Sequence, residues 1–244
     1  MRHLALFVGG LSAALLTYAV AASAQPAAKC DAAPELIEEG QQFPTIAQHL
    51  RQNLPITIVV IGGASTAGTS PGNSYPHFLE AALRRHHPGI AINVINRGVA
   101  GQTTAQMQAR FAKDVYPNRP ILVIWETGTV DAVRGQAVDV FADGLSDGVA
   151  ELKRRNFEVI LMDMQYNPAT VSVIDFEPYL NALHQTAAFQ DVYMFPRYDL
   201  MKYWSDAGIF DLVEVPQARS TALAKDIYEC LGERLADAID LGAR

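Results

Sequence analysis

Short apolar segments rich in β-branched residues alternate along the chain with longer segments that mix apolar and polar residues. The apolar segments are Ile56–Ile61, Ile92–Ile95, Ile121–Trp125, Val159–Met162 and Val192–Phe195. Continuous apolar runs of this length are typical of strands buried on both faces, and the segments between them are long enough for helical crossovers. The pattern therefore predicts an α/β fold, a three-layer α/β/α sandwich with a five-stranded parallel sheet.

Two of the expected helices have clear sequence signals. Ser74 and Pro76 are typical of a helix start, and Pro88 with Gly89 is typical of its end. Near the C-terminus, apolar residues recur every four positions and form one stripe: Leu223, Ile227, Leu231, Leu235 and Ile239. This spacing predicts a long amphipathic helix that ends just before Gly242.

The N-terminus has the pattern of an export signal. Arg2 precedes an apolar run from Leu4 to Ala22, and residues 22–24 form the small-x-small sequence that signal peptidase recognises. We therefore expect residues 1–24 to be a cleavable signal peptide and the protein to be periplasmic or secreted. The alternative is a membrane anchor, but glycine, serine and threonine interrupt the run, so no stable anchor is expected.

The rest of the chain contains no repeat, low-complexity tract or long linker. We expect one domain over residues 44–244, preceded by a loose lead-in over residues 25–43. Cys30 and Cys230 are the only cysteines, and an oxidising export route predicts a disulfide between them. Two buried free thiols are the alternative. Neither cysteine has a partner at ligand spacing, so no metal site is expected.

The charge and the glycine pattern exclude several function classes. The formal net charge is −7, and it becomes one unit more negative when the leader with Arg2 is removed. No Lys/Arg cluster is present, so nucleic acid and anionic membranes are not expected partners. Gly63 and Gly68 have P-loop spacing, but Thr69 occupies the place of the phosphate-binding lysine. The sequence therefore predicts no cofactor.

Four stretches resemble, in order, the conserved blocks of the SGNH/GDSL hydrolases. They are residues 62–70, 96–102, 124–132 and 211–214. The resemblance implies a flavodoxin-like α/β/α fold and a serine nucleophile that is activated by a histidine, which an aspartate orients. It also implies an oxyanion hole built from the serine amide, a glycine and an asparagine.

Transferred to this sequence, the family site has lost much of its chemistry. The corresponding residues are Gly63, Ala64, Gly101, Val130, Asp211 and Glu214. Gly101 and Asp211 match the family, but Ala64 replaces the nucleophile, Val130 replaces the asparagine, and Glu214 replaces the histidine. Because nucleophile and base act as a unit, this pattern favours an inactive pseudoenzyme that binds an acylated saccharide or a cell-envelope partner.

Two other functions remain open from the sequence. One is an active esterase with rearranged groups, in which Ser65 acts with Glu214 and Asp211. If Ala64 begins a helical turn, however, Ser65 is rotated by about 100° and points away from the oxyanion site, where it would cap the helix or bond locally to the backbone. The other is a partner-binding module with a filled pocket. In the expected mature chain, no histidine follows the last predicted strand. His86, His87 and His184 are expected to be structural.

Overall fold

The computed structural model describes four ranges of the chain: residues 30–32, 36–37, 42–213 and 217–244. The expected signal peptide, residues 1–24, lies outside the described residues, as does Glu214. Within the described ranges, no helix combines the length and the apolar character needed to cross a membrane.

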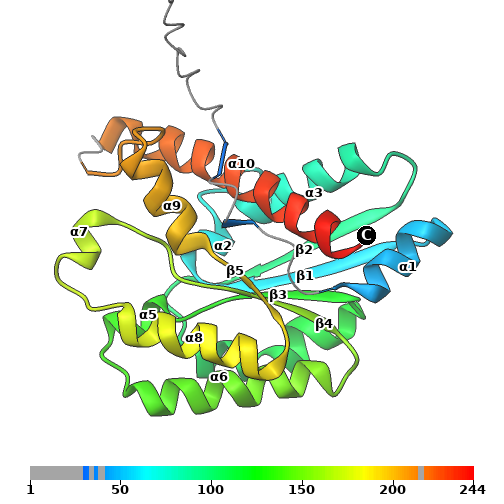
Figure 1. Ribbon diagram of the computed structural model, residues 1–244, viewed down its shortest axis with the longest axis horizontal. Coiled ribbons are helices and arrows are strands. Elements are labelled where there is room, and N and C mark those ends of the chain that lie inside the picture. Colours follow the sequence, from blue (N-terminus) through cyan, green and yellow to red (C-terminus); the bar gives the residue numbers. More distant parts are fainter. Residues whose placement is uncertain (1–29, 33–35, 38–41, 214–216) are drawn as a thin grey trace, which may run out of the picture.

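Five parallel strands form the centre of the molecule, which confirms the predicted α/β fold (Figure 1). The strands are β1 (Ile56–Gly62), β2 (Ile92–Gly98), β3 (Leu122–Glu126), β4 (Glu158–Met162) and β5 (Tyr193–Phe195). Their order is β2-β1-β3-β4-β5, and every adjacent pair is parallel. The order reverses between β1 and β3, and in such sheets ligands bind beyond the carboxyl ends of the strands at this reversal.

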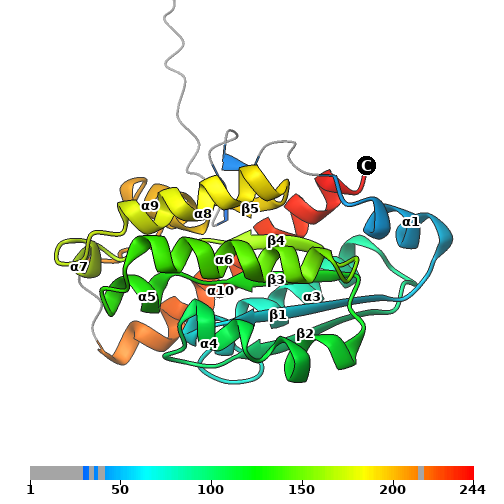
Figure 2. The ribbon, with the colours of Figure 1, turned by 90° about the horizontal axis from the view of Figure 1, so that it is seen from below.

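Helices cover both faces of the sheet, as Figures 1 and 2 show from two directions. The longer helices packed on one face are α1 (Pro44–Gln52), α3 (Tyr75–His86), α9 (Arg197–Asp206) and α10 (Gln217–Gly242). The longer ones on the other face are α6 (Val138–Lys153) and α8 (Glu177–Gln190). Short helices follow several strands, namely α2 (Ala64–Ala67), α4 (Thr104–Gln108), α5 (Thr129–Val133) and α7 (Pro168–Val171).

The strand residues divide between two apolar cores because successive side chains point to opposite faces. In β1, Ile58 and Val60 pack against the helices of one face, whereas Val59 and Ile61 pack against those of the other. The predicted stripe of α10 packs against the first of these cores. This helix continues through Gly242 and does not end before it, which corrects the expected boundary.

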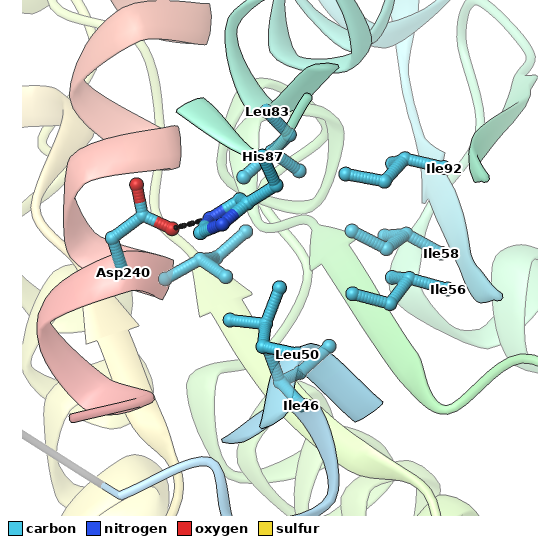
Figure 3. Close-up of a pocket in the computed structure, with 9 residues that line it drawn as sticks. Ile46, Leu50, Ile56, Ile58, Leu83, His87, Ile92 and Asp240 are labelled. Atoms are coloured by element: carbon cyan, nitrogen blue, oxygen red, sulfur yellow. Dashed lines mark hydrogen bonds and ion pairs between the residues drawn. The ribbon is translucent and has the colours of Figure 1, made fainter. Parts of the chain in front are cut away.

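Two adjacent histidines connect α3 to α10. Helix α3 is preceded by Ser74, as predicted, and its last residue is His86. Nδ1 of His86 lies 2.6 Å from Oδ2 of Asp240. Nε2 of His87 lies 2.7 Å from Oδ1 of the same carboxylate, and Figure 3 shows this second contact. The apolar residues around His87 in this view leave a cavity of only about 10 Å³, so the contact joins two packed helices and does not form a ligand site.

The predicted disulfide between Cys30 and Cys230 is present, with sulfurs 2.06 Å apart. It attaches the N-terminal lead-in to α10, whose Cys230 is buried. The carbonyl of Asp31 accepts a hydrogen bond of 2.7 Å from the indole of Trp204, and Phe43 is 1% exposed. The expectation of a loose lead-in is therefore wrong at Cys30, Asp31 and Phe43, because all three are fixed to the core.

Candidate functional site

The turn after β1 brings α2 close to the neighbouring strand. Gly63 precedes the first residue of α2, Ala64. A Cβ atom on Gly62 would lie 2.1 Å from the Thr66 hydroxyl, and one on Gly98 would lie 2.1 Å from the Ala67 nitrogen. These two glycines are therefore required for close packing between β1, β2 and α2.

A cavity of about 150 Å³ lies beyond the carboxyl ends of β1 and β3. Its walls are Gly63, Ala64, Ser65, Gly101, Gln102, Met107, Glu126, Thr127, Gly128, Thr129, Val130 and Gln165. The structure thus brings together the predicted residues Gly63, Ala64, Gly101 and Val130. Asp211 is exposed and is not among the lining residues. Glu214 lies outside the described part of the chain.

The two neighbouring residues at the start of α2 differ in burial, although both line the cavity. Ala64 is exposed and contributes a methyl group to the cavity wall. Ser65 is only 7% exposed. Its hydroxyl donates a hydrogen bond of 3.0 Å to Oε2 of Glu126 and accepts one of 2.7 Å from Nη1 of Arg197. The expected local role of Ser65 in capping α2 is therefore wrong, since both of these hydrogen-bond partners are distant in sequence.

Glu126 is the centre of this buried polar network. Its Oε2 also accepts hydrogen bonds from the backbone of Gly63, at 3.1 Å, and from the hydroxyl of Thr66, at 2.6 Å. Its Oε1 lies 3.2 Å from Nη2 of Arg197, and both side chains are almost fully buried. Burial alone would raise the pKa of Glu126, but the positive charge of Arg197 and these hydrogen bonds outweigh it and lower the pKa.

Tyr75 extends the network toward the core beneath α3. Its hydroxyl lies 2.8 Å from Oγ1 of Thr66. Because the Thr66 proton points to Glu126, Tyr75 acts as the donor in this contact. Burial, with the negative charge of Glu126, raises the pKa of Tyr75 far above its ordinary value, so the phenol remains neutral.

A second buried carboxylate fixes the other side of the cavity. Asp131, in α5, accepts hydrogen bonds of 3.0 Å from both the backbone nitrogen and the hydroxyl of Thr104. The Thr104 hydroxyl also lies 2.6 Å from that of Thr127, which follows β3. Burial raises the pKa of Asp131. These contacts join the segment after β2 to the segment after β3, and so hold Gly101 near Val130.

Sequence reasoning assigned no role to Glu126 or Arg197, although both are central here. One signal was available for Glu126, because it ends a strand whose other residues, Leu122–Trp125, are all apolar and buried. Arg197 begins α9, one residue beyond Pro196 at the end of β5, and it is 71 positions away from Glu126. Only the folded chain brings the two charges together.

The geometry is poorly suited to acyl transfer. Ala64 offers no nucleophilic atom, and Val130 offers no side-chain donor to an oxyanion. None of the described residues that line the cavity is a histidine. Glu126 is within reach of the Ser65 proton, but a carboxylate with a lowered pKa is a weak base. Among the described residues, no group of three or more His, Cys, Asp or Glu side chains could hold a metal ion.

Comparison with known proteins places these features in a family. The model of the non-GDSL lipase-like family matches residues 29–244. A curated arylesterase from Vibrio mimicus is 30% identical over 113 residues, which cover 46% of this chain and 56% of that protein. This chain thus matches little more than half of that relative's length.

Several solved structures share the fold. The SGNH-hydrolase family esterase AlinE4 is 30% identical, with a TM-score of 0.54 over 69% of this chain and 89% of that one. An acetylxylan esterase from Geobacillus stearothermophilus is 19% identical, with a TM-score of 0.60 over 75% of this chain and 94% of that one. A GDSL-like lipase structure from Parabacteroides merdae is 15% identical, with a TM-score of 0.60 over 76% and 96%.

Proposed function

Since the chain belongs to the non-GDSL lipase-like family, among the SGNH/GDSL hydrolase-like proteins, we propose that it is an exported protein that binds an acylated saccharide without hydrolysing it. The observation that carries this proposal concerns two neighbouring residues at the start of α2. Ala64, at the nucleophile position, lines the cavity and has no reactive group, and the neighbouring Ser65, which also lines it, has its hydroxyl bonded to Glu126 and Arg197.

The size and composition of the cavity support a short acyl group as the bound moiety. Its volume of about 150 Å³ has room for an acetyl group but not for a long fatty-acyl chain. Ala64, Val130 and Met107 supply apolar contacts for such a group, and burial of apolar surface favours binding. The fold neighbour named as an acetylxylan esterase suggests acetylated saccharides as the first ligands to test.

Absence of hydrolysis is the first expected result. With p-nitrophenyl acetate at neutral pH, we expect no turnover above background, because nucleophile and base are both missing. The combined substitutions Ala64→Ser, Val130→Asn and Glu214→His restore the groups of the family site and are expected to raise hydrolysis by about 100-fold over the unmodified protein, which is the lower end of what general acid–base catalysis contributes. The initial rate of nitrophenolate release measures both.

The alternative function is an active esterase in which Ser65 is the nucleophile. It is favoured by one observation, the 3.0 Å contact between its hydroxyl and a carboxylate. Turnover by the unmodified protein that disappears in a folded Ser65→Ala variant would establish this alternative. Turnover that survives Ser65→Ala would instead identify a contaminant.

Binding of an acetylated ligand is the second expected result. We expect an acetylated xylo-oligosaccharide to bind and its deacetylated counterpart to bind more weakly, as measured by isothermal titration calorimetry. Ala64→Leu should weaken binding by about tenfold, because the larger side chain fills the cavity. Ala188→Leu, at an exposed position of α8, is the matched control and should leave the affinity unchanged. Equal affinity for both saccharides would rule out acyl recognition.

A further inference from the structure

Within the described residues, β2 is the last strand at one edge of the sheet (Figure 2). It is seven residues long, whereas β5, at the opposite edge, has only three. A long edge strand presents backbone N–H and C=O groups that can pair with a strand of another chain. The outer edge of β2 is therefore the longer of the two edges at which this sheet could be extended.

The hydrogen bonds between β1 and β2 show which residues of β2 direct their backbone groups outward. The nitrogen of Ile56 donates to the carbonyl of Ala91. At the other end of the pair, the nitrogen of Val99 donates to the carbonyl of Gly62. Successive residues of a strand direct these groups to opposite sides, so the odd-numbered residues of this segment bond to β1. The residues whose groups lie at the outer edge are Ile92, Val94, Asn96 and Gly98.

Two residues of α3 already bond to this outer edge. Nε and Nη2 of Arg84 lie 3.0 and 2.7 Å from the carbonyl oxygen of Ile92. The backbone nitrogen of Val94 donates a hydrogen bond of 2.7 Å to Oε2 of Glu80. The two side chains also pair with each other, since Oε1 of Glu80 lies 3.0 Å from Nη2 of Arg84. One ion pair, which we call the Glu80–Arg84 pair, thus supplies both a donor and an acceptor to the edge of β2.

The Glu80–Arg84 pair occupies the hydrogen-bonding positions of one residue of a further strand. In a parallel ladder, a residue donates its N–H to one carbonyl of the neighbouring strand and accepts from an N–H two positions further along that strand. The pair makes the same two bonds, at the same spacing. Near the other end of the edge, the nitrogen of Gly98 donates to Oδ1 of Asn96 at 2.8 Å. A strand added in either direction would have to displace these side chains.

We propose that the Glu80–Arg84 pair keeps two copies of this chain from joining through the outer edges of β2. Each copy offers both donors and acceptors along this edge, so the edge is complementary to itself. A two-fold axis would place the two edges side by side in one continuous sheet, and such a contact closes as a dimer. This inference goes beyond the proposed function and does not depend on it, since neither residue of the pair lines the cavity beyond β1 and β3.

The test compares the molar mass of the purified, disulfide-bonded protein with that of the double variant Glu80→Ala with Arg84→Ala, by size-exclusion chromatography with light scattering. At high protein concentration, we expect the variant to have about twice the mass of the unmodified protein, and to lose this difference on dilution. The two substitutions together leave the net charge unchanged, so a loss of electrostatic repulsion does not explain the association. An unchanged mass in a variant that is folded by circular dichroism would overturn the proposal.

A single substitution carries the test if the double variant does not fold. Arg84→Ala uncovers only the carbonyl of Ile92 and makes the protein one charge more negative, which opposes association. A concentration-dependent rise in mass is still expected, though smaller than for the double variant. If this variant also kept the mass of the unmodified protein at every concentration, the proposal would be wrong.

The matched control is the double variant Arg85→Ala with Glu233→Ala. It removes an exposed ion pair between α3 and α10, again without a change in net charge, and neither of its residues bonds to β2. We expect it to keep the mass of the unmodified protein. If the control associated as strongly as Glu80→Ala with Arg84→Ala, loss of any ion pair from α3 would suffice, and the proposal would be wrong.

A proline substitution locates the contact on β2. Val94→Pro removes the outward N–H and leaves the bonds between β1 and β2 in place, because proline is tolerated where the N–H of an edge strand faces away from the sheet. Added to Glu80→Ala with Arg84→Ala, it should restore the mass of the unmodified protein. Hydrogen exchange is the second measurement, since the amides of Val94 and Asn96 should exchange more slowly in the associated double variant than in its diluted form. Association without this protection would place the contact elsewhere and contradict the proposal.

Discussion

Replacing Arg197 by methionine is expected to lower the free energy of unfolding by about 3 to 5 kcal/mol at pH 7, because it leaves the buried charge of Glu126 without its counter-ion. Both side chains are nearly inaccessible to solvent, so water cannot take the place of the guanidinium. The same change removes the donor to the Ser65 hydroxyl. Equilibrium denaturation in urea, monitored by circular dichroism, measures the loss.

The pH dependence of this loss provides a sharper test than its size. In the unmodified protein, the folded-state pKa of Glu126 lies below its ordinary value. The contribution of Glu126 to the free energy of unfolding is therefore present above the ordinary pKa and is lost as the pH falls through the folded-state pKa. Without Arg197, burial should raise the pKa of Glu126 and let the carboxyl protonate. The destabilisation by Arg197→Met should therefore be smaller at pH 4 than at pH 7.

Two controls separate this effect from general damage to α9. Lys202→Met, which breaks an exposed ion pair with Asp206 on the same helix, should change stability by less than about 1 kcal/mol. The double variant Glu126→Gln with Arg197→Met should be more stable than the sum of the single losses predicts, because it removes both charges. Strict additivity of the two substitutions would contradict the proposed coupling.

Loss of the disulfide is the second large effect that we expect. The double substitution Cys30→Ala and Cys230→Ala should lower the free energy of unfolding by about 4 to 5 kcal/mol on the chain-entropy model, because the bond closes a very long loop. The two cysteines are 200 positions apart. At this chain length, a loss of that size should lower Tm by more than about 8 °C, which differential scanning calorimetry measures.

Reduction of the unmodified protein is the matching control, since it opens the same loop without changing a side chain. The substituted and the reduced proteins should show the same Tm within about 2 °C if loop closure is the main contribution. A loss of less than about 1 kcal/mol in the free energy of unfolding would contradict this prediction. It would mean that the Trp204 to Asp31 hydrogen bond and the buried Phe43 already hold the lead-in against the core.

The residues of the candidate site are of two kinds: some lack the required group altogether, and one carries a group whose role depends on its surroundings. At Ala64 and Val130 the sequence alone identifies the missing groups, because alanine and valine lack them in any conformation. At Ser65 the sequence leaves the outcome open, because a hydroxyl can act, cap or pack according to where it points. Its burial and its hydrogen bonds to Glu126 and Arg197 support the proposal that Ser65 is not a nucleophile.

The sequence by itself determined the elements and their order. The five strands, the stripe of α10 and the Cys30 to Cys230 pair were all predicted from it, because strand and helix periodicity are local properties and only two cysteines were available to pair. Tertiary structure alone decided which charges meet. Glu126 and Arg197, which form an ion pair in the core, are 71 positions apart in the sequence. Such contacts depend on how the crossovers place whole elements side by side, and no local pattern encodes that placement.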